Sequence, residues 1–203
     1  MENNAIPVEQ HPLQPFLPPN GRILMLGSFP PQQKRWAKGF NFFYPNFSND
    51  MWRVMGLVFF GDRLWLVDEA KRTYRMADIV ELLETKGIGL YDTACEVRRL
   101  QDNASDKFLE VVRRTDIEAL LQQMPLCHTI VTTGQKATET MCEHYGVAQP
   151  PMGGYSEFEL EGRGQMRLYR MPSTSRAYPL SIIAKAEAYR RMFAEVLGQN
   201  ETI

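Results

Sequence analysis

Cysteine and histidine are scarce in this sequence, which limits the metal and redox chemistry open to it. Its 203 residues include three of each. Cys95, Cys127 and Cys142 are an odd number, with neither the CxxC spacing of a zinc site nor a fourth partner for an iron–sulfur cluster. The histidines lack metal-ligand spacing as well, so we interpret them as structural. We therefore expect reduced, inert thiols and no metal, iron–sulfur cluster or other cofactor.

Long apolar runs and a targeting segment are missing too. The first 20 residues are polar and contain five prolines, without the basic start and apolar centre of a signal peptide. No later run approaches the roughly 20 apolar residues of a membrane span. We therefore expect a cytoplasmic protein with no membrane partner, and we expect it to be a monomer.

The sequence also lacks a strong net charge. A formal charge of −1 argues against wholesale coating of nucleic acid, because non-specific binding is driven mainly by neutralising phosphates. The charge is unevenly distributed, since seven basic residues and one acid lie between Arg163 and Arg191. A basic edge on an acidic body fits a protein that presents one face to DNA. The alternative is that some of these arginines only solvate a helix face.

Internal repeats are absent, and the composition favours one domain. With an apolar fraction of 44%, the chain can bury one sizeable core. We expect an extended, proline-rich N-terminal arm over residues 1–20, a single domain over 21–198 and a C-terminal tail over 199–203. The arm either lies on the domain or extends into solvent.

Short apolar runs alternate with helical patterns along the domain. Buried strands are predicted over 22–27, 88–92 and 128–133, and a hairpin over 155–160 and 165–171. Helices are predicted after an N-cap at Ser48, over 76–87, over 116–123 behind a capping box of Thr115 and Glu118, over 134–145, and between Pro179 and Gly198. The last helix carries an apolar stripe: Ile182, Ile183, Ala186, Tyr189, Met192, Phe193, Val196 and Leu197. This alternation predicts a three-layer α/β/α fold with a central, mostly parallel sheet, whose ligands bind beyond the carboxyl ends of the strands.

The first segment with chemical potential follows the first predicted strand. It reads GSFPP from Gly27 to Pro31, and FNFFYPNFSNDMW follows from Phe40 to Trp52. A flat heterocycle needs aromatic faces to stack on and amides that donate and accept along its edge, and this segment offers both, with the carboxamides of Asn46 and Asn49. From the residues alone, a loop whose aromatic side chains fill the core is the favoured interpretation.

The order of the motifs resembles a known family. Along the chain, a predicted strand is followed by GSFP, YPNxxNxxW, GI-L-D, TTGxxA, PSTS and a long C-terminal helix. Motifs in this order resemble the hypoxanthine-DNA glycosylase-like branch of the uracil-DNA glycosylase superfamily. More distantly, they resemble the mismatch-specific uracil/thymine glycosylases. The similarity spans about Gly21 to Leu197, and it implies a uracil-DNA glycosylase-like fold with a base pocket formed by Gly27, Ser28, Phe29, Pro30 and Tyr44.

The resemblance also implies catalytic residues. In the mismatch-specific enzymes the first loop reads GINPG and its asparagine positions the attacking water, whereas this sequence has Ser28 and Phe29 there. In the hypoxanthine branch an asparagine of the following segment is implicated, and its best match is Asn49, with Asn46 in reserve. Tyr44 would stack on the extruded base, together with Phe29. Two departures concern substrate choice: Asn46 occupies a histidine position, and Asp50-Met51 replaces the more usual Arg-Phe.

A second loop reads PSTSRAYP just ahead of the last predicted helix. Its three hydroxyls and Arg176 can contact phosphate oxygens, although a Ser/Thr run before a helix is also an ordinary capping segment. By the resemblance, the loop presses into the minor groove, with Arg176 or Tyr178 as the wedge. The predicted DNA-binding residues of this loop are Pro172, Ser173, Thr174, Ser175, Arg176 and Tyr178.

Two further features lie at predicted strand ends. Gly134 and Lys136 open a helix directly after a strand, where its amides and the lysine can bind a phosphate; the alternative is a glycine turn. Asp92 ends its strand and either caps the next turn or lies at the rim of the pocket. We do not assign it the role of a general base.

The resemblance predicts a monofunctional DNA glycosylase. Such an enzyme flips a damaged base, such as uracil or hypoxanthine, out of mismatched or damaged DNA and leaves an abasic site for base excision repair. Asn49 would orient the water or hold the base edge, and the backbone of Ser28 and Phe29 would contact the leaving base. Two alternatives stay open: a non-catalytic relative that binds DNA or nucleobases, and a small hydrolase that uses Ser28, although no G-x-S-x-G elbow surrounds it.

Overall fold

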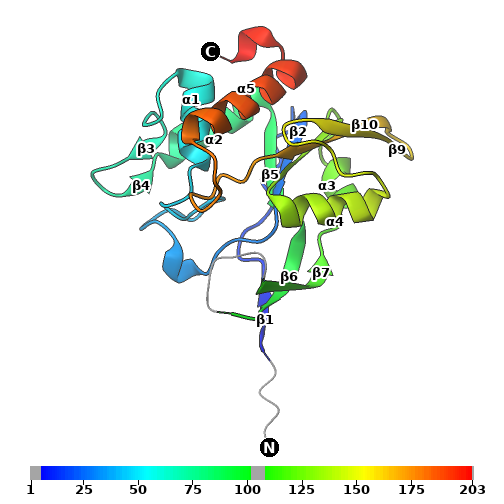
Figure 1. Ribbon diagram of the computed structural model, residues 1–203, viewed down its shortest axis with the longest axis horizontal. Helices are drawn as coiled ribbons and strands as arrows, with labels where there is room; N and C mark the ends of the chain where they lie inside the picture. The colour runs from blue at the N-terminus through cyan, green and yellow to red at the C-terminus, as the bar shows by residue number, and fades with distance from the viewer. Residues whose placement is uncertain (1–5, 102–107, 203) are drawn as a thin grey trace, which may run out of the picture.

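A five-stranded sheet forms the centre of the fold (Figure 1). The structure is a computed structural model that describes residues 6–101 and 108–202, so the first five residues of the predicted arm and the last residue of the predicted tail lie outside the described residues. The strands, in spatial order, are β5 (Ile88–Asp92), β2 (Ile23–Gly27), β8 (Thr129–Thr133), β10 (Gly164–Met171) and β9 (Tyr155–Leu160). Neighbouring strands are parallel except for β9, which forms the predicted hairpin with β10. Strands β2, β5 and β8 are buried along their whole length, as expected for parallel strands covered on both faces.

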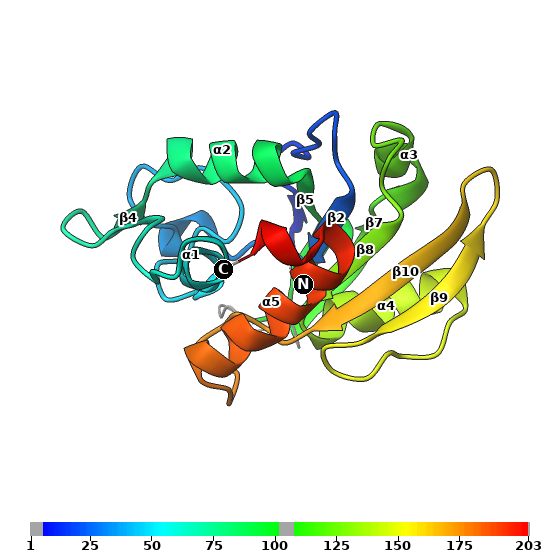
Figure 2. The same cartoon turned by 90° about the horizontal axis from the view of Figure 1, so that it is seen from above.

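Helices cover both faces of this sheet. They are α1 (Met51–Phe60), α2 (Met76–Lys86), α3 (Ile117–Gln122), α4 (Gln135–Tyr145) and α5 (Ile182–Leu197). Figures 1 and 2 show α1, α2 and α5 together on one side of the sheet and α3 and α4 on the other. The predicted α/β fold, with three layers and a mostly parallel sheet, is therefore confirmed.

Two predicted helix caps are wrong by one or two residues. Asp50, not Ser48, is the N-cap of α1, because the backbone N–H of Ser48 donates to the Asn46 side chain in the preceding turn. Asp116, not Thr115, caps α3, and its carboxylate accepts from the N–H of Ala119. The Thr115 hydroxyl instead donates to the carbonyl of Asp92, which ties the start of α3 to the end of β5.

A second, antiparallel sheet lies beyond the carboxyl end of β5. It consists of β1 (Val8–Gln10), β6 (Ala94–Arg99) and β7 (Leu109–Arg114), with β6 in the middle. The N-terminal arm supplies β1, and Phe16 of the arm pairs with Leu90 of β5. The small elements are the hairpin of β3 (Val67–Asp68) and β4 (Thr73–Tyr74), and the 3-10 turns η1 (Gln33–Arg35) and η3 (Gln199–Glu201).

Helix α5 buries most of its predicted apolar stripe, with one exposed member. Tyr189 and Phe193 are fully buried. Ile183, however, is 63% exposed, so its place in the stripe is wrong. Its neighbour Lys185 is only 1% exposed, because its ammonium group reaches the carbonyl of Ser175 and the carboxylate of Asp50.

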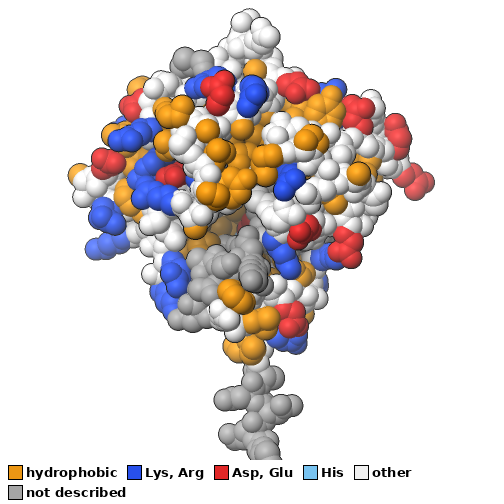
Figure 3. All heavy atoms as spheres, viewed as in Figure 1, with side chains coloured by type: hydrophobic (Ala, Val, Ile, Leu, Met, Phe, Trp, Pro, Cys, Tyr) orange, Lys and Arg blue, Asp and Glu red, His pale blue; other side chains and the backbone are white. Residues whose placement is uncertain are grey.

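Some basic side chains of the stretch from Arg163 to Arg191 bind other parts of the molecule, and the predicted basic edge stays a prediction. Arg163 donates to backbone carbonyls around the end of α3, and Arg167 pairs with Glu157 and Glu195. The two carboxylates thus compensate the charge of Arg167, whereas the carbonyls only satisfy the hydrogen bonds of Arg163. Figure 3 shows Lys and Arg side chains gathered on the flank over β3, β4 and η1, and acidic side chains at the opposite edge near β9.

The structure can also be searched for membrane-spanning helices, metal-ligand clusters and disulfides. Within residues 6–101 and 108–202, no helix has the length and apolar character needed to cross a membrane. Over the same ranges, no three His, Cys, Asp or Glu side chains gather closely enough to hold a metal ion. All three cysteines are free, and burial raises the pKa of the Cys127 thiol to about 11, which disfavours the reactive thiolate.

Candidate functional site

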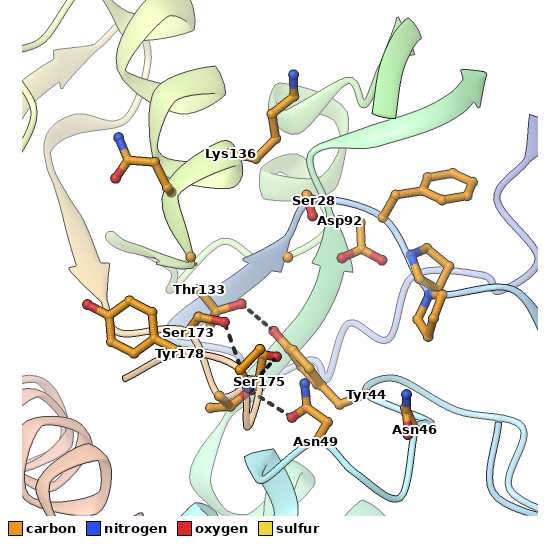
Figure 4. Close-up of a pocket in the computed structure, with 18 of the residues that line it drawn as sticks. Ser28, Tyr44, Asn46, Asn49, Asp92, Thr133, Lys136, Ser173, Ser175 and Tyr178 are labelled. Carbon is orange, nitrogen blue, oxygen red and sulfur yellow. Dashed lines mark hydrogen bonds between the residues drawn. The ribbon is translucent and has the colours of Figure 1, made fainter. Parts of the chain in front are cut away.

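A pocket of about 1040 Å³ opens at the carboxyl ends of β2, β5 and β8 (Figure 4). The GSFPP loop follows β2, Asp92 ends β5, and Thr133 ends β8 just before α4. The PSTSRA loop follows β10 and closes another side. These segments meet because parallel strands place their carboxyl ends at one edge of the sheet, which is where ligands of open α/β sheets bind.

The pocket brings together nearly all the residues singled out in the sequence. Those that line it are Gly27, Ser28, Phe29, Pro30, Tyr44, Asn46, Asn49, Gly134, Lys136, Ser173, Thr174, Ser175, Arg176 and Tyr178. Pro172 is the exception. It is buried, and its carbonyl accepts a hydrogen bond of 3.0 Å from the Tyr189 hydroxyl, so it anchors the loop to α5.

Tyr44 projects into this pocket from a strained backbone. Its φ of +51° lies in the left-handed region, where a residue with a side chain costs of order 1–3 kcal/mol. Its hydroxyl lies 2.9 Å from the Thr133 hydroxyl, and its ring packs edge-on to Trp52 at 6.2 Å. The contact with Thr133 fixes the ring across the floor of the pocket, between Asn49 at one end and Asp92 at the other in the view of Figure 4.

Asn49 presents a fixed carboxamide beside Tyr44. Its Oδ1 accepts hydrogen bonds of 2.8 Å from the N–H of Met51 and from the Thr174 hydroxyl. Because a backbone N–H can only donate, the atom facing Met51 must be the oxygen, which sets the orientation of the amide. The oxygen is thus occupied, and the NH₂ group is the part of Asn49 left to bind a ligand.

Asn46 shapes the same loop. Its Oδ1 accepts from the N–H of Ser48, and its carbonyl accepts from the N–H of Asn49 and from the Tyr74 hydroxyl. Tyr74 also donates to the carbonyl of Asn49, at 3.1 Å. These bonds hold the backbone on both sides of Phe47 and set the position of Asn49.

The PSTSRA loop is bound to α1 and α5 by a buried charged cluster. The N–H of Asp50 donates to the carbonyl of Thr174, and Arg176 Nε donates to Asp50 Oδ1 at 2.9 Å. Lys185 Nζ donates to the carbonyl of Ser175 at 2.8 Å and lies 3.7 Å from Asp50 Oδ2. Burial lowers the pKa of the Lys185 ammonium group, and Asp50 partly offsets this. Arg176, a predicted wedge, is therefore held by Asp50 while its side chain remains half exposed.

Phe29 contributes its ring to a wall of the pocket. It is buried in a small cluster with Ala94, Val97 and Leu109 of the second sheet, and it meets the His11 ring edge-on at 5.3 Å. The Phe29 ring thus packs against the second sheet while the residue also lines the pocket, and its stack on an extruded base stays a prediction.

Sequence reasoning missed the contribution of the N-terminal arm. His11 is buried, and its Nε2 lies 2.8 Å from Asp92 Oδ2. On the same arm, Glu9 accepts two hydrogen bonds from the buried Arg99, which also donates to the carbonyl of Pro30 at 3.1 Å. The arm thus supports both Asp92 and the GSFPP loop. No local pattern around His11 reveals these partners, which lie 81 and more residues away in the sequence.

Comparisons with known proteins show a likeness to solved structures. No family model matches the sequence, and no curated protein matches it. Among solved structures, the chain is similar to the solution NMR structure of a "putative Uracil DNA glycosylase" from Methanosarcina acetivorans. The two are 22% identical with a TM-score of 0.56, over 92% of this chain and 98% of the other. The likeness shows that this chain shares its fold with that protein along nearly its whole length.

Proposed function

We propose that this chain is a monofunctional DNA glycosylase that flips a deaminated base such as uracil or hypoxanthine and excises it. The reaction leaves an abasic site for base excision repair. The shared fold and the order of the motifs support this, and one observation carries it. The amide of Asn49 is locked beside the ring of Tyr44, with its oxygen occupied and its NH₂ group free to donate to a base.

The pocket supplies what an extruded base requires. Extrusion costs a few kcal/mol, and one aromatic stack returns about 1–3 kcal/mol. Tyr44 supplies an aromatic ring for such a stack. Fixed hydrogen-bond donors must therefore supply the rest, and the Asn49 NH₂ group can stabilise the negative charge that develops on a leaving base.

DNA would reach the pocket over the PSTSRA loop and the basic flank. Ser173 and Ser175 line the pocket with hydroxyl groups, and Lys136 adds a positive charge near the N-terminus of α4. Beside the pocket, a hollow is lined by Arg63 and Arg72, both exposed on the flank that Figure 3 shows as basic. Phosphates bound along this side would keep the flipped nucleotide over Tyr44.

The second candidate function is lesion or nucleobase binding without catalysis. The occupied oxygen of Asn49 favours it, because an amide that cannot accept from water cannot orient the nucleophile by that atom. The hydrolase alternative has less support. The described histidines all have partners other than Ser28: His11 bonds Asp92, His128 bonds the carbonyl of Gln165, and His144 bonds Glu118.

A panel of oligonucleotides tests the proposal. Duplex and single-stranded DNA carrying uracil, hypoxanthine or a normal base is incubated with the protein, and alkali then cleaves any abasic site. Alkali-labile product at one modified base, with none at the normal base, is expected. Tight lesion binding without such product would instead establish the non-catalytic function.

The variant Asn49→Asp tests the role of the Asn49 NH₂ group as a hydrogen-bond donor. It keeps the oxygen that Met51 and Thr174 need but replaces the NH₂ donor with a second oxygen. We expect the rate of base release to fall by about 10²-fold or more, as on loss of one preorganised donor. Asn41→Asp is the matched control, since Asn41 is exposed on the same segment and does not line the pocket. Full activity in Asn49→Asp would remove the assigned role.

A further inference from the structure

The attacking water needs a hydrogen-bond acceptor, and Asn49 does not offer one. Both 2.8 Å bonds to its Oδ1 come from the protein. Among the described residues that line the pocket, two are carboxylates, Asp92 and Glu139. Glu139 is exposed on α4 and accepts from Gln135. Asp92 is the buried one, with a side chain only 10% exposed.

One oxygen of Asp92 is fixed by His11, and the residue itself lines the pocket. Oδ2 lies 2.8 Å from His11 Nε2, whereas none of the described residues donates to Oδ1. A Cβ atom on Gly27 would collide with Oδ1 and would lie 3.8 Å from the Tyr44 hydroxyl, so Oδ1 and that hydroxyl both lie close to Gly27, which lines the pocket as well. The absence of a side chain at Gly27 is what leaves room there.

His11 is held so that it can keep donating to Asp92. Its Nδ1 lies 3.1 Å from the N–H of Leu13 and 2.9 Å from the carbonyl of the same residue. A neutral ring accepts from that N–H, and a protonated ring donates to that carbonyl; in both states Nε2–H points at Asp92. The rings of Phe29 and Tyr91 pack around His11 at 5.3 and 4.5 Å and limit its movement.

We propose that Asp92 is a catalytic residue that binds the nucleophilic water through Oδ1, and that His11 of the N-terminal arm is its positioning residue. The assignment rests on the proposed glycosylase function. The water oxygen bonds to C1′ of the sugar while the C1′–N bond breaks and its electron pair leaves with the base. The water proton passes to Asp92 Oδ1, and the carboxylic acid then returns it to solvent. Water is consumed, and the products are an abasic sugar and a free base.

The geometry favours water over the base as the partner of Oδ1. Asp92 and Ser28 lie at one end of the pocket and Asn49 at the other, with Tyr44 between them in Figure 4. A base stacked on Tyr44 that receives a hydrogen bond from Asn49 therefore has its edge directed away from Asp92. The end of the pocket next to Asp92 remains for a water.

Single-turnover kinetics of base release, with excess protein, test the proposal. The variants are Asp92→Asn, His11→Ala, His11→Gln and the double variant of Asp92→Asn with His11→Ala. Asp78→Asn and His128→Gln are the matched controls, because both lie outside the pocket. Dissociation constants for the lesion-containing duplex and circular dichroism spectra are measured on the same samples, which separates loss of chemistry from loss of binding or folding.

Asp92→Asn should slow base release at least about 10²-fold, the usual contribution of a positioned base. The dissociation constant should change less than threefold. His11→Ala should slow release about tenfold in the wild-type background and add little in the Asp92→Asn background, because it acts through that carboxylate. His11→Gln keeps an N–H donor near the Nε2 position and should recover most of the rate.

The outcomes separate this proposal from the one on which it rests. Absence of base release by the wild-type protein on every substrate overturns the glycosylase function and the role of Asp92 with it. Release by the wild type and equally by Asp92→Asn overturns only the role of Asp92. A weaker dissociation constant that accounts for the slower rate shows that Asp92 binds the base rather than the water. Equal effects of His11→Ala in both backgrounds overturn the positioning role.

Discussion

Replacing the buried Lys185 with methionine should destabilise the protein and loosen the PSTSRA loop. Methionine has a similar length and no charge, so the change removes the charged hydrogen bond to the carbonyl of Ser175, which is worth about 1.5–3 kcal/mol. It also leaves the Asp50 carboxylate with Arg176 as its remaining charged partner. Breaking a buried pair costs about 3–5 kcal/mol, but Arg176 reduces this cost and the ammonium group no longer needs desolvation. We expect a loss of about 2–3 kcal/mol.

Urea denaturation followed by circular dichroism measures this loss, and thermal unfolding should show a midpoint lower by roughly 5–10 °C. Lys38→Met, at an exposed lysine, is the matched control and should stay within about 0.5 kcal/mol of the wild type. Adding Asp50→Asn to Lys185→Met should restore part of the stability, because the carboxylate left without its buried partner is then gone. A free energy of unfolding for Lys185→Met equal to that of the control would refute this account of the cluster.

Three other predictions follow from single contacts. Gly27→Ala should slow base release by about 10²-fold, since its Cβ displaces Asp92 Oδ1, and an unchanged single-turnover rate would contradict this. Burial raises the pKa of Tyr74 to about 12, so between pH 10 and 12 the unfolded state ionises first and stability falls by about 1.4 kcal/mol per pH unit for this one group. In Tyr74→Phe, the free energy of unfolding should fall less steeply with pH, as measured by urea titrations at pH 9, 10 and 11. A slope equal to that of the wild type would count against this prediction. In fluorescence anisotropy, Arg72→Ala should weaken DNA binding and lower the salt dependence by about one ion, whereas Arg167→Ala, which loses a paired arginine, should not.

The central sheet and its helices could be predicted because their signals are local. Strands β2 and β5 are short and mostly apolar, β8 has an apolar pair between threonines, and all three show the burial of parallel strands covered on both faces. The same signals placed the pocket, since they put GSFPP, Asp92 and the start of α4 at one sheet edge. The cap of α1 shifted, because Ser48 and Asp50 are both good caps and the turn at Asn46 selects between them.

The second sheet and the support of the site could not be predicted in this way. Strands β6 and β7 carry charged residues on an exposed face, and β1 is three residues long in a proline-rich arm, so none has a strong pattern of its own. Lys185 resembles any basic residue of a solvated helix, and it is buried only because Asp50 meets it from 135 positions earlier. Likewise, Asp92, the hydrogen-bond partner of His11, lies 81 positions later in the sequence. Such pairs depend on tertiary structure, which short sequence windows do not contain.

Three residues of the pocket, Asn49, Asp92 and Tyr44, are held in place by hydrogen bonds to the protein. Asn49 is held by its oxygen and Asp92 by Oδ2, which leaves the NH₂ group of the one and Oδ1 of the other for a ligand, and the Tyr44 hydroxyl is held by Thr133. A donor thus faces the pocket at one end, an acceptor at the other, and an aromatic face lies between them. A base that leaves as an anion needs the donor, whereas a water that loses a proton needs the acceptor. Because both are fixed before the substrate binds, the two halves of the reaction would be served by groups that need not reorient.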